Sequence, residues 1–231
     1  GVMVARGDLG IETSLVDLPN IQRRIMYACA KWGRRSIVAK QLLESMISNP
    51  TPTRAEVTDI ANAIYEGADG IMLSGETGVG KYPKECVNFL KSIAIKTEKF
   101  RTLGYEKSFM PNSDWQHIGV AAKNLAESIN ADGIIAITRT GKTANYISNS
   151  KPNGIPLFTF TGNKKTLNQL SLIGSTVSFY LSNLSNHEKT LINVSKILKK
   201  YYGKNKKDLK FIMVSSIFSE EHSEAIQIIN I

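Results

Sequence analysis

The chain has 231 residues, of which 42% are hydrophobic, 21% charged and 8% aromatic, a composition that excludes disordered, collagen-like and small disulfide-linked proteins. Its longest apolar runs are much shorter than the ~20 residues that cross a bilayer, so we expect no membrane span. The net charge of +9 falls almost entirely in the second half, because residues 1–98 carry 12 Lys and Arg against 11 Asp and Glu, while residues 99–231 carry 17 against 9.

The first part of the sequence predicts short buried strands that alternate with helices. Strands are predicted where a short apolar run ends in a polar loop, and helices where apolar residues recur every three or four positions. The predicted order is strand 1–5, helix 20–32, strand 36–39, short helix 41–47, helix 53–66, strand 70–73 and helix 83–98. Thr53 and Glu56 have the spacing of a capping box. Strands alternating with helices predict a parallel sheet.

Residues 99–112 interrupt this rhythm with Gly104, Pro111 and polar side chains, and we place a linker there. A second α/β series follows. Its predicted order is helix 114–130, strand 133–137, helix 143–150, strand 157–161, helix 164–172, strand 176–181, helix 189–202, strand 211–214 and an alternating edge strand 225–229. The sequence therefore predicts two α/β domains, residues 1–98 and 113–231. Because the chain starts with Gly1 rather than Met, we expect it to be a fragment.

Charged side chains directly follow the first two predicted strands. Asp8 lies past the first strand, where a carboxylate either binds a hard cation through oxygen or caps the next helix. The neighbouring Arg6 would hold Asp8 ionised and could contact a phosphate. Lys40 ends the second strand, and it either clamps a phosphate or pairs with Glu44 one helical turn later.

The third predicted strand is followed by a candidate phosphate-binding loop. Residues 75–81 read Gly-Glu-Thr-Gly-Val-Gly-Lys, which has the G-x-x-x-x-G-K spacing of such loops. Tyr82, however, stands where the loop needs Ser or Thr to hold Mg²⁺, and Pro83 removes a backbone donor. A loop shaped by glycines at a strand end is therefore the preferred interpretation, and a nucleotidase built on Lys81 is the less favoured hypothesis.

Another candidate anion site lies in the second domain, between a predicted strand and a predicted helix. It consists of Thr138, Arg139, Thr140, Gly141, Lys142 and Thr143. Hydroxyls, two cations and the amides of a helix N-terminus are suited to an anion, and we favour this over a simple capped turn. The Lys-rich stretch 196–210 is interpreted as a solvated helix end, because no recognition motif accompanies it, so we expect no nucleic-acid partner.

Four motifs of the first domain, in this order and spacing, resemble the pyruvate kinase family. They are Val-Ala-Arg-Gly-Asp-Leu-Gly-Ile at 4–11, Gln-Leu-Leu-Glu-Ser-Met at 41–46, Pro-Thr-Arg-Ala-Glu at 52–56, and Met-Leu-Ser-Gly-Glu-Thr at 72–77 with Lys-Tyr-Pro at 81–83. The second domain resembles that family more weakly. The resemblance implies the last three strand–helix units of a (β/α)₈ TIM barrel, followed by a three-layer α/β C-terminal domain. The earlier strands and the catalytic Lys of the family would precede Gly1.

The family transfers a phosphoryl group between phosphoenolpyruvate and ADP in glycolysis, with Mg²⁺ or Mn²⁺ and usually K⁺. The resemblance implies that Asp8 is a metal ligand and that the backbone of Arg6, Gly7 and Asp8, at a helix N-terminus, binds the substrate carboxylate. Arg6 would also brace this loop, and Arg6 and Lys40 are assigned to catalysis. Ser74 and Glu76 would line the same end of the barrel. An oligomer, a tetramer by resemblance, is implied, and the 231-residue chain alone is expected to be inactive.

Lys40 departs from the family, which usually has Thr at this position to hydrogen-bond the substrate and relay a proton. A protonated lysine adds charge and cannot accept a hydrogen bond. Either Lys40 disables the site, which would make the protein a non-catalytic regulatory or scaffolding subunit of a hetero-oligomer, or its ammonium replaces K⁺. The surrounding residues 38–46 resemble α-type subunits of plastid pyruvate kinases, which favours a plastid-like organelle over the cytoplasm.

The loop 138–143 resembles the sugar-bisphosphate effector loop of the family. After Val214, however, the sequence has no Trp, Arg or Gly-Pro-rich loop, and Glu220 and Glu221 would oppose a phosphate. We therefore do not expect activation by fructose 1,6-bisphosphate.

Overall fold

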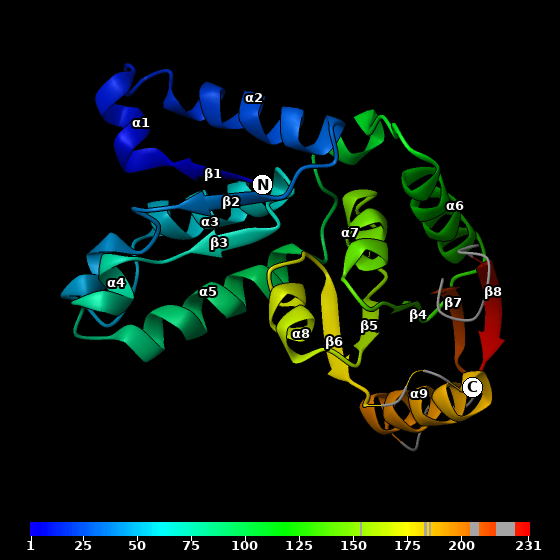
Figure 1. Ribbon diagram of the computed structural model, residues 1–231. Helices are drawn as coiled ribbons and strands as arrows, with labels where there is room; N and C mark the ends of the chain where they lie inside the picture. Colours follow the sequence, from blue (N-terminus) through cyan, green and yellow to red (C-terminus); the bar gives the residue numbers. More distant parts are fainter. Residues whose placement is uncertain (153, 183, 185, 204–207, 216–224) are drawn as a thin grey trace. The chain divides into compact units, whose positions relative to one another are not determined.

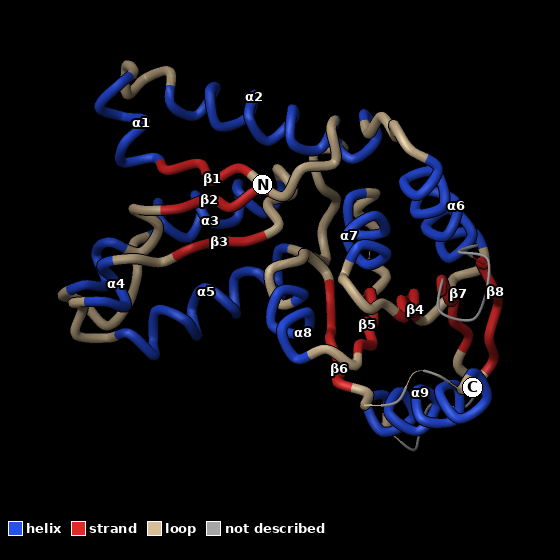
Figure 2. Tube along the Cα trace, viewed as in Figure 1, coloured by secondary structure: helices blue, strands red, loops and turns tan. Residues whose placement is uncertain are grey.

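The computed structural model describes residues 1–152, 154–182, 184, 186–203, 208–215 and 225–231, and it divides into two compact units, residues 1–110 and 111–231 (Figure 1). Strands alternate with helices through both units, as the sequence predicts (Figure 2). None of the helices in the described ranges has the length and hydropathy of a membrane span.

The first unit contains a parallel sheet of three strands in the order β1-β2-β3. The strands are β1 (Val2–Ala5), β2 (Ser36–Ala39) and β3 (Gly70–Met72). The helices are α1 (Arg6–Glu12), α2 (Leu18–Lys31), α3 (Arg54–Tyr65), α4 (Gly75–Gly78) and α5 (Pro83–Thr97), with 3₁₀ turns η1 (Glu44–Ile47) and η2 (Tyr105–Ser108). Three strand–helix units in a parallel sheet are what the resemblance implies for the end of a barrel.

Two details of the first unit differ from the sequence prediction. Helix α1 begins at Arg6, directly after β1, where the residue pattern indicated a loop and only the resemblance implied a helix N-terminus. Most of the expected linker packs in the first unit, because η2 lies against α2 and the rings of Tyr27 and Tyr105 meet edge to face with centroids 5.7 Å apart. A T-shaped aromatic pair stabilises beyond the area it buries, so this segment is anchored rather than free.

The strand register of the first unit determines where the loops emerge. Ala5 pairs with Ala39, and Ala39 pairs with Met72, so the three strands end level with one another. The buried core below them includes Val4, Val38 and Ile60. Because the strands are parallel, the residues that follow β1, β2 and β3 all emerge at the same edge of the sheet.

The second unit contains a five-stranded sheet in the order β6-β5-β4-β7-β8, in which only the edge strand β8 is antiparallel to its neighbour. The strands are β4 (Gly133–Ile137), β5 (Leu157–Thr161), β6 (Thr176–Tyr180), β7 (Lys210–Ser215) and β8 (Ala225–Asn230). The helices are α6 (Asp114–Ser128), α7 (Lys142–Asn149), α8 (Lys164–Leu170) and α9 (His187–Tyr202).

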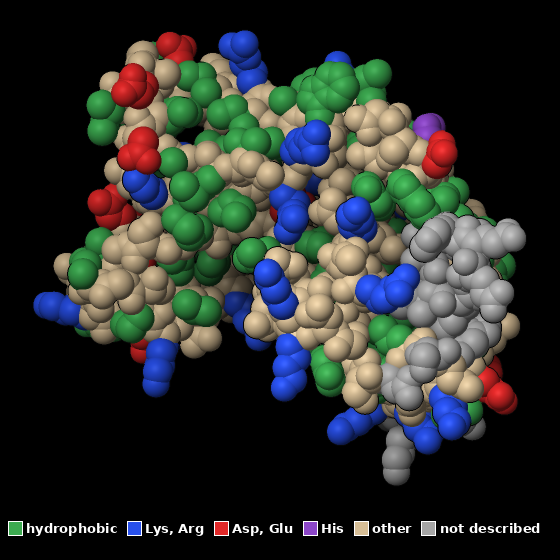
Figure 3. All heavy atoms as spheres, in the orientation of Figure 1, with side chains coloured by type: hydrophobic (Ala, Val, Ile, Leu, Met, Phe, Trp, Pro, Cys, Tyr) green, Lys and Arg blue, Asp and Glu red, His purple; other side chains and the backbone are tan. Residues whose placement is uncertain are grey.

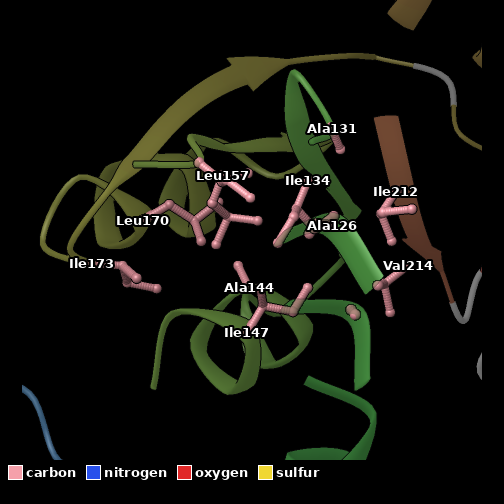
Figure 4. Close-up of a cluster of buried hydrophobic side chains, with 13 residues drawn as sticks. Ala126, Ala131, Ile134, Ala144, Ile147, Leu157, Leu170, Ile173, Ile212 and Val214 are labelled. Atoms are coloured by element: carbon pink, nitrogen blue, oxygen red, sulfur yellow. The ribbon is translucent and has the colours of Figure 1, made fainter. Parts of the chain in front are cut away.

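Alternate residues of this sheet enter two separate cores, which makes three layers. One core joins the sheet to α6, α7 and α8, and Figure 4 shows Ala144, Ile147 and Leu170 directed toward the strand residues Ile134 and Leu157. The other core joins the opposite face to α9. It contains Ile135, Phe158, Phe160, Phe211, Val194 and Leu198. Because both faces are covered, β4 and β5 are buried along their whole length, and most of their residues are apolar, as in buried parallel strands.

Candidate active site

Three short segments follow the level strand ends of the first unit. They are Arg6–Asp8 after β1, Lys40–Gln41 after β2 and Ser74–Glu76 after β3. The register brings together residues that are more than 30 positions apart in sequence, as was expected of candidate site residues at parallel strand ends. The contacts between these segments define the candidate site.

Lys40 and Asp8 form an ion pair across the ends of β1 and β2. The Lys40 Nζ atom donates to Oδ1 of Asp8 at 2.8 Å and to Oδ2 at 3.0 Å. The Asp8 side chain is 66% exposed and the Lys40 side chain 37% exposed. The sequence suggested Glu44 as a partner for Lys40 and Arg6 as a partner for Asp8. The structure instead pairs the two proposed site residues with each other.

Arg6 is buried and joins three segments of the chain. Its Nε donates to the carbonyl of Lys40, its Nη2 donates to the carbonyls of Lys40 at 3.0 Å and Gln41 at 2.8 Å, and its Nη1 pairs with Asp59 of α3. Arg6 therefore braces the loop after β2, whereas the resemblance implied that it braces its own loop after β1. Asp59 was missed by the sequence analysis, because no local pattern links it to an arginine 53 positions earlier.

The backbone after β2 is held in an unusual conformation. Lys40 and Gln41 have φ angles of 71° and 55°, in the left-handed region that non-glycine residues seldom adopt. The carbonyls of both residues are the ones that Arg6 binds. Gly7 lies beneath the Lys40 stem, since a Cβ atom placed there would lie 3.3 Å from the Lys40 Cδ atom. The direction of the Lys40 side chain is therefore set by the turn and by the room above Gly7.

Glu76 does not line the barrel end as expected, because it is buried beneath the loop. Its carboxylate accepts hydrogen bonds from the amides of Leu42 and Leu43 at 3.3 and 3.1 Å and from the amide of Ser74 at 2.8 Å. Burial alone raises the pKa of Glu76, but these backbone amides and its own amide outweigh burial and leave the pKa below its ordinary value. Glu76 is an anchor for the site loop.

Glu56 of α3 anchors the next residues of the same connection. The capping box is confirmed, because Glu56 accepts from the Thr53 amide while the Thr53 hydroxyl accepts from the Glu56 amide. Its carboxylate also accepts from the amide and the hydroxyl of Ser45. Burial raises the pKa of Glu56, but the hydrogen bonds from Ser45 and Thr53 outweigh it and lower the pKa overall. The connection between β2 and α3 is thus held by two carboxylates.

The donor set at Asp8 does not by itself fit a metal ion. Asp8 is an exposed carboxylate, the ligand type that Mg²⁺ prefers, but both of its oxygens receive the Lys40 ammonium. Across the described residues, no group of three or more His, Cys, Asp or Glu side chains is placed to hold a metal. A metal could use Asp8 only after Lys40 had moved and other ligands had been supplied.

The loop 75–81 is not a phosphate-binding loop. The amides of Thr77 and Gly78 donate to the carbonyl of Ser74, those of Val79 and Gly80 donate to the carbonyl of Gly75, and the Lys81 amide donates to the carbonyl of Ile47. A phosphate loop needs these amides free to face the anion. A methyl group at position 80 would also clash with the carbonyl of Glu76, so Gly80 is required for the tight turn. The preferred interpretation, a loop shaped by glycines, agrees with this geometry.

The loop 138–143 connects β4 to α7 in the second unit. Arg139, Thr140 and Lys142 are exposed, whereas Thr138 and Thr143 are buried. The Thr138 hydroxyl accepts from the amide of Gly141, which has a φ of 83°. The two cations and one threonine therefore face solvent beside the start of α7. Glu220 and Glu221, which the sequence analysis set against a phosphate here, lie outside the described residues.

The basic excess of the second half is dispersed on the face that Figure 3 shows, where Lys and Arg side chains stand mostly apart from one another. Lys199 and Lys200 belong to the last turn of α9, where cations interact favourably with the helix dipole. Lys204, Lys206 and Lys207 lie outside the described residues.

Comparison with known proteins gives the same family for both units. Residues 1–87 match the family described as pyruvate kinase, barrel domain, and residues 116–229 match pyruvate kinase, alpha/beta domain. A pyruvate kinase of Thermotoga maritima is 43% identical over 181 residues, covering 77% of this chain and 38% of the relative. One of Agrobacterium vitis is 35% identical over 226 residues, covering 96% and 47%.

A solved structure agrees with the sequence relatives. The crystal structure of a pyruvate kinase from Cryptosporidium parvum is similar to the whole chain with a TM-score of 0.90 and 30% identity, and the chain covers 46% of it. The chain therefore spans less than half the length of these relatives.

Proposed function

The chain belongs to the pyruvate kinase family, and from this premise we propose that it forms part of an enzyme that transfers a phosphoryl group from phosphoenolpyruvate to ADP, giving pyruvate and ATP. The observation that carries the proposal is the level register of β1, β2 and β3, which brings the family-motif residues that follow these strands to one edge of the sheet. Phosphoryl transfer depends on positioning and on neutralising charge, and the segment supplies a rigid loop and a cation for these purposes.

The residues of this chain have distinct roles in the proposed site. The amides of Gly7 and Asp8 belong to the first turn of α1, where amides have no partner within the helix, and we assign them to the substrate carboxylate. Lys40 is the cation that faces the same strand ends. Arg6, being buried and fully engaged, acts by positioning the backbone that carries Lys40.

Family membership implies a divalent metal, typically Mg²⁺. Asp8 is the carboxylate of this chain that we assign to Mg²⁺ or Mn²⁺, with the remaining ligands outside it. Whether K⁺ takes part depends on Lys40, whose ammonium already places a monovalent cation at the site. The family also implies phosphoenolpyruvate and ADP as substrates and usually an oligomer, and we extend the proposal to a plastid-like compartment on the resemblance of residues 38–46.

Replacing Asp8 tests the proposal. In the full-length protein, Asp8→Ala should abolish phosphoenolpyruvate turnover and divalent-metal binding while the melting temperature stays within a few degrees, because an exposed carboxylate contributes little to packing. Asp17→Ala is the matched control, since Asp17 is also exposed and its side chain makes no cap hydrogen bond. Unchanged metal affinity and turnover in Asp8→Ala would refute the assignment.

A second candidate function is favoured by the ion pair. Because Lys40 occupies both oxygens of Asp8, the protein could serve as a regulatory or scaffolding subunit that activates a catalytic partner of the same family. An assay of the full-length protein alone and together with such a partner separates the two functions. Turnover by the protein alone supports catalysis, and turnover that appears only in the mixture supports the subunit role.

A further inference from the structure

We propose that the Lys40 ammonium is a resident counter-ion of Asp8, which a divalent cation must displace before it can bind that carboxylate. The inference rests on the proposed function and deepens it, because it adds a competition step to metal binding at the same site. The geometry that carries it is the position of Nζ, which lies 2.8 and 3.0 Å from the two oxygens of one carboxylate.

The ammonium takes the place on Asp8 that a small cation would take. A carboxylate that binds a cation through both oxygens places it between them, and Nζ bridges the same two atoms. A metal and the ammonium cannot share this position, because two like charges at contact distance repel each other strongly. Metal binding between these two oxygens therefore requires the Lys40 side chain to turn away.

The fold places the Lys40 side chain beside Asp8. Arg6 binds the carbonyls of Lys40 and Gln41 and so holds both residues at positive φ. The stem of Lys40 then crosses Gly7, where any side chain would crowd it. A long side chain leaving this turn has its end beside Asp8, which is the next residue after Gly7.

The competition predicts a coupling between metal and substrate. An anionic substrate offers the Lys40 ammonium another partner once it leaves Asp8, so phosphoenolpyruvate should strengthen metal binding. By linkage, the metal should strengthen phosphoenolpyruvate binding by the same factor. Without the ammonium, this contribution to the coupling is lost.

The test is a titration of the full-length protein with Mn²⁺, first without substrate. The electron paramagnetic resonance signal of free Mn²⁺ measures how much of the metal is bound. Lys40→Met is the main variant, because methionine keeps an unbranched stem and removes the charge, whereas the β-branched threonine is strained at a φ of 71°. We expect Lys40→Met to bind Mn²⁺ about three- to tenfold more tightly, a modest gain because exposed ion pairs are weak. Lys81→Met, on an exposed lysine of the loop after α4, is the matched control and should leave the affinity unchanged.

Two further variants complete the test. Lys40→Gln, which keeps a hydrogen-bond donor, should also bind Mn²⁺ more tightly, and Lys40→Met combined with Asp8→Asn should lose the gain. Repeating the titration with phosphoenolpyruvate should show a smaller enhancement in Lys40→Met than in the wild type. Equal or weaker Mn²⁺ binding in folded Lys40→Met and Lys40→Gln would overturn the inference. The proposed function fails separately, when the wild-type protein has no turnover or Asp8→Ala keeps it.

Discussion

One guanidinium at Arg6 connects the ends of β1 and β2 to helix α3. It makes four hydrogen bonds, three to the carbonyls of Lys40 and Gln41 and one to Asp59. The planar fork of arginine can serve several acceptors in fixed directions, whereas a lysine ammonium is a single point donor. The unusual backbone of the turn at Lys40 therefore depends on an arginine at position 6.

Arg6→Lys in the full-length protein is expected to lower the free energy of unfolding by about 1–3 kcal/mol, because acceptors lose their donors and Asp59 loses its close partner. Chemical denaturation with urea measures this directly. Arg54→Lys, on an exposed arginine of the same region, is the control and should change stability by less than about 0.5 kcal/mol. Equal effects of the two substitutions would show that Arg6 does not brace the turn.

Glu76→Gln should destabilise the first unit by about 2 kcal/mol at neutral pH, because an amide has one acceptor oxygen where the carboxylate has two and presents an NH₂ group to backbone donors. The pKa of Glu76 is lowered in the folded state, from an ordinary value of 4.5. Its contribution is therefore complete above about pH 4.5 and is lost as the pH falls through the lower, folded-state pKa. Urea titrations between pH 3 and 7 should show the wild type and Glu76→Gln converging in acid, and a constant difference would contradict this.

At the residue scale, the sequence did not predict which partners the site residues contact. The resemblance implied a bracing role for Arg6 within residues 6–8, but in the structure Arg6 braces the loop after β2. The partners Asp59 for Arg6 and Asp8 for Lys40 were not predicted, since they depend on strand register and on a positive φ at Lys40. Glu76 was expected at the surface of the site, and its burial follows from the tight turn of α4.

Among the elements, α3 begins with a complete capping box, which is a local sequence signal for the start of a helix. Thr53→Ala should cost about 1 kcal/mol of stability, because the Glu56 amide loses its acceptor. Thr58→Ala is the control within the same helix, since the Thr58 hydroxyl only bonds back to the carbonyl of Arg54. Thermal denaturation should give a clearly lower melting temperature for Thr53→Ala than for Thr58→Ala, and the reverse order would argue against the cap.

The elements that the sequence predicted well are those whose patterns are local. Strand β4 has the predicted bounds, 133–137, because its apolar run is bordered by polar residues and glycine. The residue pattern alone did not predict helix α1, since Arg6-Gly7-Asp8-Leu9-Gly10 carries two glycines and lacks an apolar stripe. Its helical form is imposed by packing at the end of β1 and by the contacts that Arg6 makes. The antiparallel direction of β8 also depends on the fold rather than on its alternating sequence.

For the whole molecule, the 231-residue chain by itself should not turn over phosphoenolpyruvate. Its first sheet has three strands, and a closed barrel of this family's type has eight. The side chains of Val2 and Met3 on one edge strand and Met72 on the other are exposed, so the isolated chain should also tend to associate. A coupled assay for pyruvate with the purified chain and the full-length protein measures the difference, and turnover by the isolated chain would contradict the prediction.

The carboxylates of Glu76 and Glu56, which anchor the loop after β2, have a consequence for how slowly the first unit exchanges its amide hydrogens with deuterium. The amides of Leu42, Leu43 and Ser45 lie outside the strands and α-helices, yet each donates to Glu76 or Glu56. Such amides exchange only when their hydrogen bond to the carboxylate breaks, and that requires the surrounding structure to open locally. In hydrogen-exchange mass spectrometry, the amides of these three residues should exchange about as slowly as those of strand β2. An irregular loop would then have the exchange rate of the neighbouring sheet.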